Sequence, residues 1–268
     1  MTTGDGVRSD VPDGPVPSGR NGEQLLDLIR VMARLRAPGG CPWDREQDHR
    51  SLAKHLLEET HEVIDAIDSD DAGRLRDELG DLLLQVVFHA EIAREEGEYD
   101  IDDVAEGIVR KLIRRHPHVF GDAEVDSAGE VLVNWERIKS EEKGEHGVEH
   151  DIPKTLPALA RASKVQRRAA GSGFEWRTKD AAMAKLREEV GELDGASPEN
   201  AEEELGEVLF AAAAVARSLG VDPESALRRT TTKFANRYES TIERAKAEGV
   251  DLSAMSDVDL LAYFRNRA

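Results

Sequence analysis

Apolar side chains recur every three or four positions along most of the chain, the spacing expected of helices with one buried face. The first such stretch runs from Gly22 to Leu35, and a longer one begins near Ser51. Similar stretches follow at 72–96, 102–115 and 130–140, and then at 158–170, 180–194, 199–219, 223–247 and 256–267. No segment alternates apolar and polar positions between hairpin signals, as a half-buried strand would. The pattern therefore predicts an all-α protein.

Segments rich in glycine, proline and polar residues divide this helical pattern. Residues 1–20 contain no apolar core of a signal peptide, and we expect them to form a disordered tail. Residues 141–157 hold two glycines and two prolines and are interpreted as a linker between two helical domains, residues 21–140 and 158–268. The stretch 36–44 also holds two glycines and two prolines, and we expect a loop there.

The charge balance narrows the choice of partners. The chain has 36 Lys+Arg against 55 Asp+Glu, a formal net charge of −19, which argues against nucleic acid as the main partner. An acidic chain is better suited to holding divalent cations, or to staying soluble.

Cys41 is the one cysteine, so no intramolecular disulfide can form and a reducing compartment is expected. The chain contains no run of about 18 apolar residues, the length that a membrane-spanning helix needs. We expect a cytoplasmic protein.

A pattern of acidic residues occurs twice along the chain. The motif E-E-x-x-E at 58–62 is followed by E-L-G-D at 78–81, and the second half has E-E-x-x-E at 188–192 followed by E-L-G-E at 204–207. Downstream, Lys111 and Arg115 stand four apart, as do Lys233 and Arg237. The order of two acidic motifs and one basic pair is therefore repeated.

The helical positions of these acids suggest a metal site. Residues three or four apart share one face of a helix, so an antiparallel hairpin would bring four or five carboxylates to one place. Such a cluster repels itself unless a cation fills it or some groups take up protons. Mg²⁺ suits it, because this ion prefers oxygen ligands and keeps water and phosphate oxygens in its shell. Lys111 and Arg115 would then face the phosphates of a bound nucleotide.

A solvated helix face is the plainer explanation, since E-E-x-x-E arises by chance in so acidic a chain. Two observations favour the metal site over it. Leucines and valines surround the second motif of each pair, which places these acids near a buried face. Gly80 and Gly206 lie inside helices at a cost of about 1 kcal/mol relative to alanine, which suggests close packing or the approach of a ligand.

At these residues the sequence resembles the MazG family of nucleoside triphosphate pyrophosphohydrolases, one of the all-α NTP pyrophosphatases. The resemblance spans roughly residues 20–268 and adds several segments to the acidic motifs: Cys41-Pro42-Trp43-Asp44 with Gln47, Arg114 to Phe120, Trp135-Glu136-x-Ile138-Lys139, Lys164-Val165-Gln166 and Gly173-Phe174. It implies two tandem helical-bundle domains completed by homodimerisation. It also implies Mg²⁺-dependent hydrolysis of NTPs and dNTPs between the α- and β-phosphates, with Mn²⁺ as a substitute ion.

The resemblance also implies roles for individual residues. The metal ligands would be Glu59, Glu62, Glu78 and Asp81 in the first domain, and Glu189, Glu192, Glu204 and Glu207 in the second. Glu58 and Glu188 would serve as the water-activating base or as a further ligand. Lys185, Lys233 and Arg237 would contact the phosphates, and Tyr263 would lie against the base.

Two residues depart from the family pattern. Glu207 stands where the family usually has Asp, and the extra methylene displaces a ligand for an ion with strict geometry. His55 stands in the first domain where the second has Lys185. The resemblance implies that, as in two-domain relatives, the second domain carries the hydrolysis and the first is weak or silent. In this sequence the complete acidic motif favours the first domain, whereas Lys185, Lys233 and Arg237 favour the second. Both domains therefore stay candidates, and the second is the preferred one.

The hypothesis for the mechanism is a water molecule that attacks the α-phosphorus while Mg²⁺ and basic side chains hold the triphosphate and the leaving pyrophosphate. Two alternatives remain at this point. One is a non-catalytic helical regulator that binds nucleotides. The other is a pyrophosphohydrolase restricted to an alarmone or a damaged nucleotide.

Overall fold

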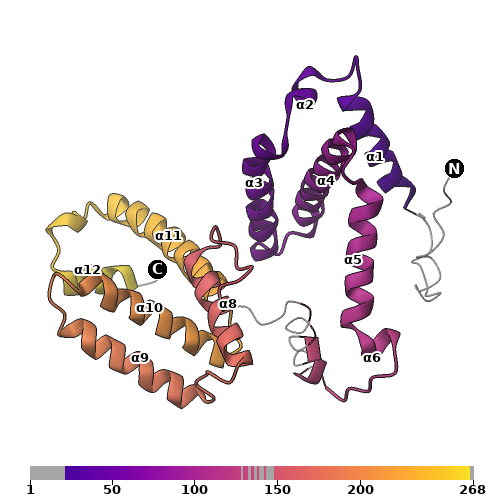
Figure 1. Ribbon diagram of the computed structural model, residues 1–268. Helices are drawn as coiled ribbons and strands as arrows, with labels where there is room; N and C mark the ends of the chain where they lie inside the picture. The colour runs from indigo at the N-terminus through magenta and orange to yellow at the C-terminus, as the bar shows by residue number, and fades with distance from the viewer. Residues whose placement is uncertain are drawn as a thin grey trace. The chain divides into compact units, whose positions relative to one another are not determined.

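The computed structural model describes residues 22–127, 129–131, 134, 135, 138, 142 and 148–265. Within these ranges the chain consists of helices and turns, without a strand (Figure 1). It divides into two compact units, Met1–Lys139 and Ser140–Ala268. The predicted all-α fold in two tandem parts is therefore confirmed. The predicted tail at 1–20 and the first part of the predicted linker lie outside the described residues.

The N-terminal unit is built on a pair of long helices. Its elements are α1 (Glu23–Arg36), α2 (Pro42–Glu46), α3 (His49–Asp68), α4 (Ala72–Glu96), α5 (Ile101–Arg115) and α6 (Pro117–Phe120). Helices α3 and α4 pack against each other, and α1 packs on α4 (Figure 1). Their shared core contains Met32, Leu52, Val87, Phe88 and Ile92. The short turn at 69–71 makes α3 and α4 a hairpin, as the metal-site hypothesis requires.

A buried arginine joins α1, α2 and α4. The guanidinium of Arg36 donates to both carboxylate oxygens of Glu95, at 3.1 and 2.8 Å. It also donates to the carbonyl oxygens of Asp44 and Gln47, and it lies over the ring of Phe88. Because the donors are shared among three segments, Arg36 holds the chain between α1 and α3 in place.

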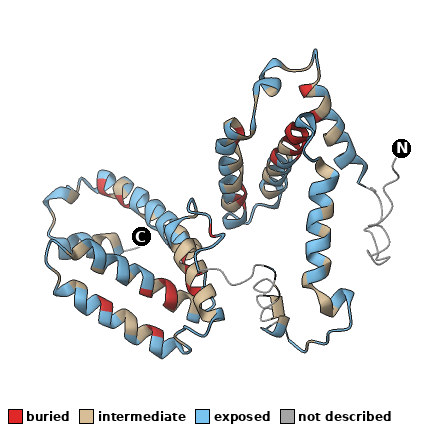
Figure 2. Ribbon diagram, in the orientation of Figure 1, coloured by how far each residue is buried: buried red, intermediate tan, exposed pale blue. Residues whose placement is uncertain are grey.

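The C-terminal unit has the same kind of hairpin. Its elements are α8 (Ala158–Gly171), α9 (Lys179–Asp194), α10 (Ala201–Ser218), α11 (Pro223–Glu248), the 3₁₀ turn η1 (Leu252–Ala254) and α12 (Asp257–Arg265). Helices α9 and α10 pack closely, and α8 packs on α10. Several buried residues of these helices are small: Ala182 on α9, and Ala211, Ala213 and Ala214 on α10. Figure 2 marks buried segments of both helices in red. The side chain of Gln166 on α8 donates to the carbonyl of Phe210 at 2.8 Å.

The helices match the sequence prediction except at short elements. Part of the predicted loop at 36–44 is helical, because Pro42 begins α2 at a position where its missing N–H costs nothing. Helices α6 and η1 were also not predicted, each being a single turn. The predicted helix at 130–140 is helical at the positions described. The predicted last helix, 256–267, corresponds to α12, and its last two residues lie outside the described residues. Among the described helices, none is long and apolar enough to cross a membrane.

Candidate metal centre

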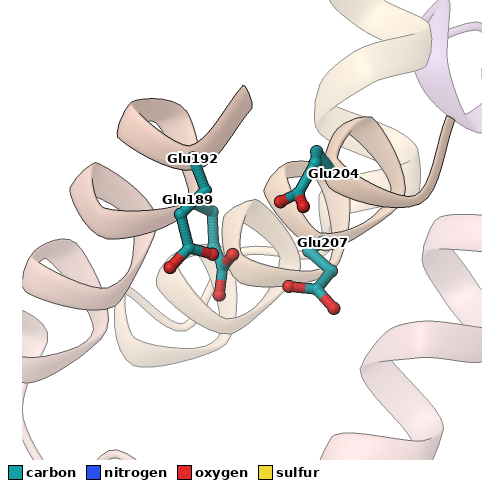
Figure 3. Close-up of side chains that lie close together, drawn as sticks. All are labelled: Glu189, Glu192, Glu204 and Glu207. Atoms are coloured by element: carbon teal, nitrogen blue, oxygen red, sulfur yellow. The ribbon is translucent and has the colours of Figure 1, made fainter. Parts of the chain in front are cut away.

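Four glutamates meet between α9 and α10. Glu189 and Glu192 come from α9 and Glu204 and Glu207 from α10, and one carboxylate oxygen of each lies within 4.8 Å of the others (Figure 3). The two residues in each pair are three apart, so they share a face, and the packing of α9 on α10 turns the faces together. Glu189 is buried, Glu204 is half-buried, and the other two are exposed. The structure therefore brings together all four residues that the sequence predicted as ligands.

Lys185 lies beside this cluster, one turn before it on α9. Its Nζ is 2.6 Å from Glu189 Oε1 and 2.7 Å from Glu188 Oε1. The hydrogen bond from Lys185 lowers the pKa of Glu189, and the two glutamates raise the pKa of Lys185. A hydrogen bond with the ionised Glu189 raises the pKa of Glu207, and the charge of Glu189 raises the pKa of Glu192. One lysine therefore offsets only part of the negative charge.

The unpaired oxygens in this cluster fit a cation. Glu189 Oε2 and Glu204 Oε2 are buried, and neither has a hydrogen-bond partner among the described residues. Buried carboxylate oxygens are costly unless a donor or an ion satisfies them. Carboxylate oxygens are also the ligands that Mg²⁺ prefers. The longer side chain of Glu207 does not remove it from the group.

The corresponding group in the N-terminal unit is smaller. Glu59, Glu78 and Asp81 place one oxygen each within 4.8 Å of the others. Burial, followed by the charge of Asp81, raises the pKa of Glu59, and a hydrogen bond with Glu62 adds to the shift. Glu62 itself is exposed and lies outside this group of three. The predicted fourth ligand is thus a neighbour of Glu59 rather than a member of the cluster.

The glutamates predicted as bases lie at the edge of each cluster. Glu188 is held by Lys185, and Glu58 pairs with Nδ1 of His55 at 3.0 Å. His55 therefore takes in the first unit the place that Lys185 has in the second. Both glutamate side chains are more than half exposed, at 56% and 63%. Both are open to water.

The remaining predicted substrate residues have other neighbours. The guanidinium of Arg237 donates to the carbonyl of Arg265 at 2.8 Å and lies over the Phe264 ring. Tyr263 donates from its hydroxyl to Glu248 at 2.7 Å, which ties α12 to the end of α11. Lys233 is exposed on α11. Their phosphate and base contacts stay predictions.

The basic pair of the first unit lies on α5. Lys111 is exposed, and the guanidinium of Arg115 lies 5.5 Å from the centroid of the Trp135 ring. Their predicted role in phosphate binding also stays a prediction.

Two polar side chains that the motif analysis missed support the clusters. Asn200 donates to Glu204 at 3.2 Å, and Arg74 donates to Glu78 at 3.2 Å. Each stands four residues before the first acid of its E-L-G motif, so a comparison of the two repeats could have identified both positions from the sequence. Close packing inside the chain does not explain Gly80 and Gly206, because a Cβ at either would meet nothing within 4 Å.

Comparison with known proteins agrees with the repeat. The family model described as MazG nucleotide pyrophosphohydrolase domain matches residues 47–120 and 177–242. A relative from Escherichia coli strain K12, named nucleoside triphosphate pyrophosphohydrolase, is 45% identical over 88% of this chain and 95% of its own length. A relative from Thermotoga maritima, named nucleoside triphosphate pyrophosphohydrolase/pyrophosphatase MazG, is 44% identical over 89% of this chain and 93% of its own length. Each of the two family-model matches contains one carboxylate cluster.

Proposed function

The chain belongs to the MazG nucleotide pyrophosphohydrolase family, and we propose that the four-glutamate cluster of its C-terminal unit is the catalytic centre. The protein is an enzyme, a nucleoside triphosphate pyrophosphohydrolase. The observation that carries the assignment is the gathering of Glu189, Glu192, Glu204 and Glu207, in which two buried oxygens have no hydrogen-bond partner among the described residues. The N-terminal cluster has three members, and we assign it little or no catalytic activity.

The four glutamates would hold Mg²⁺ and would accept Mn²⁺ in its place. The ion would supply a polarised phosphate and a water of lowered pKa. Glu188, exposed next to the cluster, would take the proton from the attacking water. Lys185 would move from Glu189 and Glu188 to a phosphate oxygen when the substrate arrives, because a triphosphate competes for its three donors.

The cleavage would occur between the α- and β-phosphates. Water adds to the α-phosphorus, the bond to the bridging oxygen breaks, and the products are a nucleoside monophosphate and pyrophosphate. Lys233 and Arg237 would hold the leaving pyrophosphate. We expect common NTPs and dNTPs as substrates, with an alarmone or a damaged nucleotide as the narrower alternative.

We also propose a homodimer, because matching apolar surfaces stay exposed in both units. Leu79 and Leu83 on α4 are 47% and 41% exposed, and their repeat counterparts Leu205 and Leu209 on α10 are each 49% exposed. The leucines of each pair are one turn apart, and each pair lies on a helix that carries two members of a carboxylate cluster. Gly80 and Gly206, which have open space in front of them, leave room for a second chain. Burying such leucines against a second chain is favourable.

The single cysteine supports a cytoplasmic location for this assembly.

Matched variants of the two clusters test the assignment. Glu204→Gln removes one charge from the four-glutamate cluster, and Glu78→Gln makes the same change at the repeat-equivalent position of the N-terminal cluster. We expect Glu204→Gln to lower kcat by roughly 100-fold or more and Glu78→Gln to lower it less than about threefold. A large loss in Glu78→Gln with little loss in Glu204→Gln would move catalysis to the N-terminal unit. If the parent protein binds nucleotides but does not hydrolyse them, the alternative of a non-catalytic nucleotide-binding regulator would be favoured.

A further inference from the structure

An amide side chain outside the four-glutamate cluster holds one of its members, Glu204. Asn200, the residue before the first turn of α10, donates from Nδ2 to Glu204 Oε1 at 3.2 Å. The other oxygen of Glu204 is buried and has no hydrogen-bond partner among the described residues. In Figure 3 the carboxylate of Glu204 points toward that of Glu189. The amide thus occupies one oxygen of Glu204 and leaves the other for an ion.

The turn between α9 and α10 fixes the orientation of this amide. The backbone N–H of Ser197 donates to Asn200 Oδ1 at 2.8 Å, and the Ser197 hydroxyl donates to the same oxygen at 3.0 Å. Because a backbone N–H can only donate, the oxygen of the amide faces Ser197 and its NH₂ group faces Glu204. The carbonyl of Ser197 accepts in turn from the backbone N–H of Asn200 at 3.2 Å. Asn200 is therefore held in place by the protein alone.

The N-terminal unit has an arginine at the same place in the repeat. Arg74 stands four residues before Glu78, as Asn200 stands four residues before Glu204, and its Nε is 3.2 Å from Glu78 Oε1. The two donors therefore approach equivalent carboxylates at the same distance. They differ in charge, because the guanidinium is permanently positive and the amide is neutral.

This difference in charge acts on any cation that the clusters bind. A cation on Glu78 would lie beside the guanidinium of Arg74, and the two would repel each other. The Glu78 side chain is only 17% exposed, so water screens this repulsion less than it would at the surface. The four-glutamate cluster also has a cation, Lys185, but there it is one cation among four carboxylates rather than among three. Asn200 adds no positive charge to it.

We propose that Asn200 is a positioning residue for Glu204, and that the exchange of this amide for Arg74 makes the N-terminal cluster the weaker cation site. The inference rests on the proposed function, since it takes both clusters to bind a divalent cation. It assigns the difference between the two units to a position outside both sets of carboxylates. The acidic motifs do not make this distinction, because each unit has E-E-x-x-E and E-L-G.

Binding of Mn²⁺ to the full chain tests the role of the amide, because free Mn²⁺ has an electron paramagnetic resonance signal that is lost on binding. Glu59→Gln/Asp81→Asn disables the N-terminal cluster, so the remaining binding belongs to the four-glutamate cluster. In that protein we expect Asn200→Arg to raise the Kd for Mn²⁺ about tenfold or more. Glu202→Gln is the matched control, since it changes the net charge equally but lies two residues from Glu204, on another face of α10. It should leave the Kd within about twofold.

The reverse exchange tests the role of the arginine. Glu204→Gln/Glu207→Gln disables the C-terminal cluster, and in that protein we expect Arg74→Asn to lower the Kd for Mn²⁺ about fivefold or more. A gain of affinity cannot come from a variant that misfolds. Arg76→Asn, which removes an exposed arginine paired with Asp77, is the matched control and should leave the Kd within about twofold.

The Mg²⁺ dependence of ATP hydrolysis separates positioning from a merely structural role. In the otherwise unchanged chain, Asn200→Arg should raise the half-saturating Mg²⁺ concentration about tenfold and keep kcat within about threefold at saturating Mg²⁺. A loss of kcat that Mg²⁺ does not restore would make Asn200 a structural residue and would overturn the inference. A Kd for Mn²⁺ that Asn200→Arg does not raise, or that Arg74→Asn does not lower, would also overturn it.

Failure of this inference is distinct from failure of the proposed function. Mg²⁺-dependent hydrolysis by the parent protein, with Kd values that the two exchanges do not change, defeats the inference alone. Kd values that change as expected, without hydrolysis by the parent protein, support the inference and defeat the proposed function. A parent protein that binds no Mn²⁺ defeats both.

Discussion

Lys185 Nζ lies 2.6 Å from Oε1 of Glu189, the most buried carboxylate of the four-glutamate cluster. The other oxygen of Glu189 has no hydrogen-bond partner among the described residues. One side of this carboxylate is therefore neutralised by the protein itself, and the other side is left for an ion. The same lysine holds Glu188, so a single side chain connects the proposed metal ligands to the proposed base.

Replacing this lysine separates its two roles. We expect Lys185→Met to lower the melting temperature of the metal-free protein, because Glu189 then keeps a buried charge without a partner. Added Mg²⁺ should raise the melting temperature more in the variant than in the parent protein, since the ion takes over the neutralisation. kcat/KM should fall roughly 100-fold through loss of the phosphate contact. Lys179→Met, an exposed lysine at the start of α9, is the control; equal Mg²⁺ shifts in parent and Lys185→Met would contradict the account.

The raised pKa values in the cluster predict how its effect on stability depends on pH. Glu192 and Glu207 have pKa values above 4.5 in the folded metal-free protein, so their contribution to stability is present below pH 4.5 and is lost as the pH rises through the folded pKa values. The lowered pKa of Glu189 acts in the opposite direction, and its contribution is lost as the pH falls. We therefore expect Glu192→Gln/Glu207→Gln to raise the melting temperature of the metal-free protein at about pH 7.5 and to leave it unchanged at about pH 4. Thermal unfolding in EDTA measures both; a lower melting temperature for the variant at the higher pH would refute the prediction.

The sequence predicted the carboxylate centre well because it depends on local periodicity. Acids three apart share a helix face whatever the rest of the protein does, and the repeat indicated which helices meet. The sequence could not show that Glu62 lies outside its group, since this depends on the register between α3 and α4 and on the side-chain rotamer. The short helix α2 was also beyond prediction, because the glycines and prolines around it indicated a loop.

The proposed dimer predicts that the exposed leucines of α10 lie in its interface. We expect the parent protein to sediment at twice the 29.5 kDa mass of the chain and Leu205→Glu/Leu209→Glu to sediment as a monomer, because buried like charges replace apolar contacts. Val258→Glu, which changes the 77% exposed valine on α12, serves as the control and should stay dimeric. A monomeric parent protein, or a double variant that still dimerises, would place the interface elsewhere or remove it.

Arg36 provides a prediction about stability that is independent of the metal. Arg36→Met leaves Glu95 and two backbone carbonyls without their donor, and we expect a loss of about 2–4 kcal/mol in the free energy of unfolding. Arg30→Met breaks an exposed pair with Asp27 and should change stability by less than about 0.5 kcal/mol. Urea denaturation followed by circular dichroism gives both values. Similar losses for the two variants would mean that Arg36 does not hold α1, α2 and α4 together as described.

The central claim is Mg²⁺-dependent cleavage between the α- and β-phosphates at the four-glutamate cluster. The most direct measurement incubates the parent protein and Glu192→Gln with a panel of NTPs and dNTPs, with Mg²⁺ or with EDTA, and separates the products by anion-exchange chromatography. The account predicts monophosphate and pyrophosphate from the parent protein with Mg²⁺, and almost none from Glu192→Gln or in EDTA. Diphosphate and orthophosphate as products, or full activity in EDTA, would contradict it.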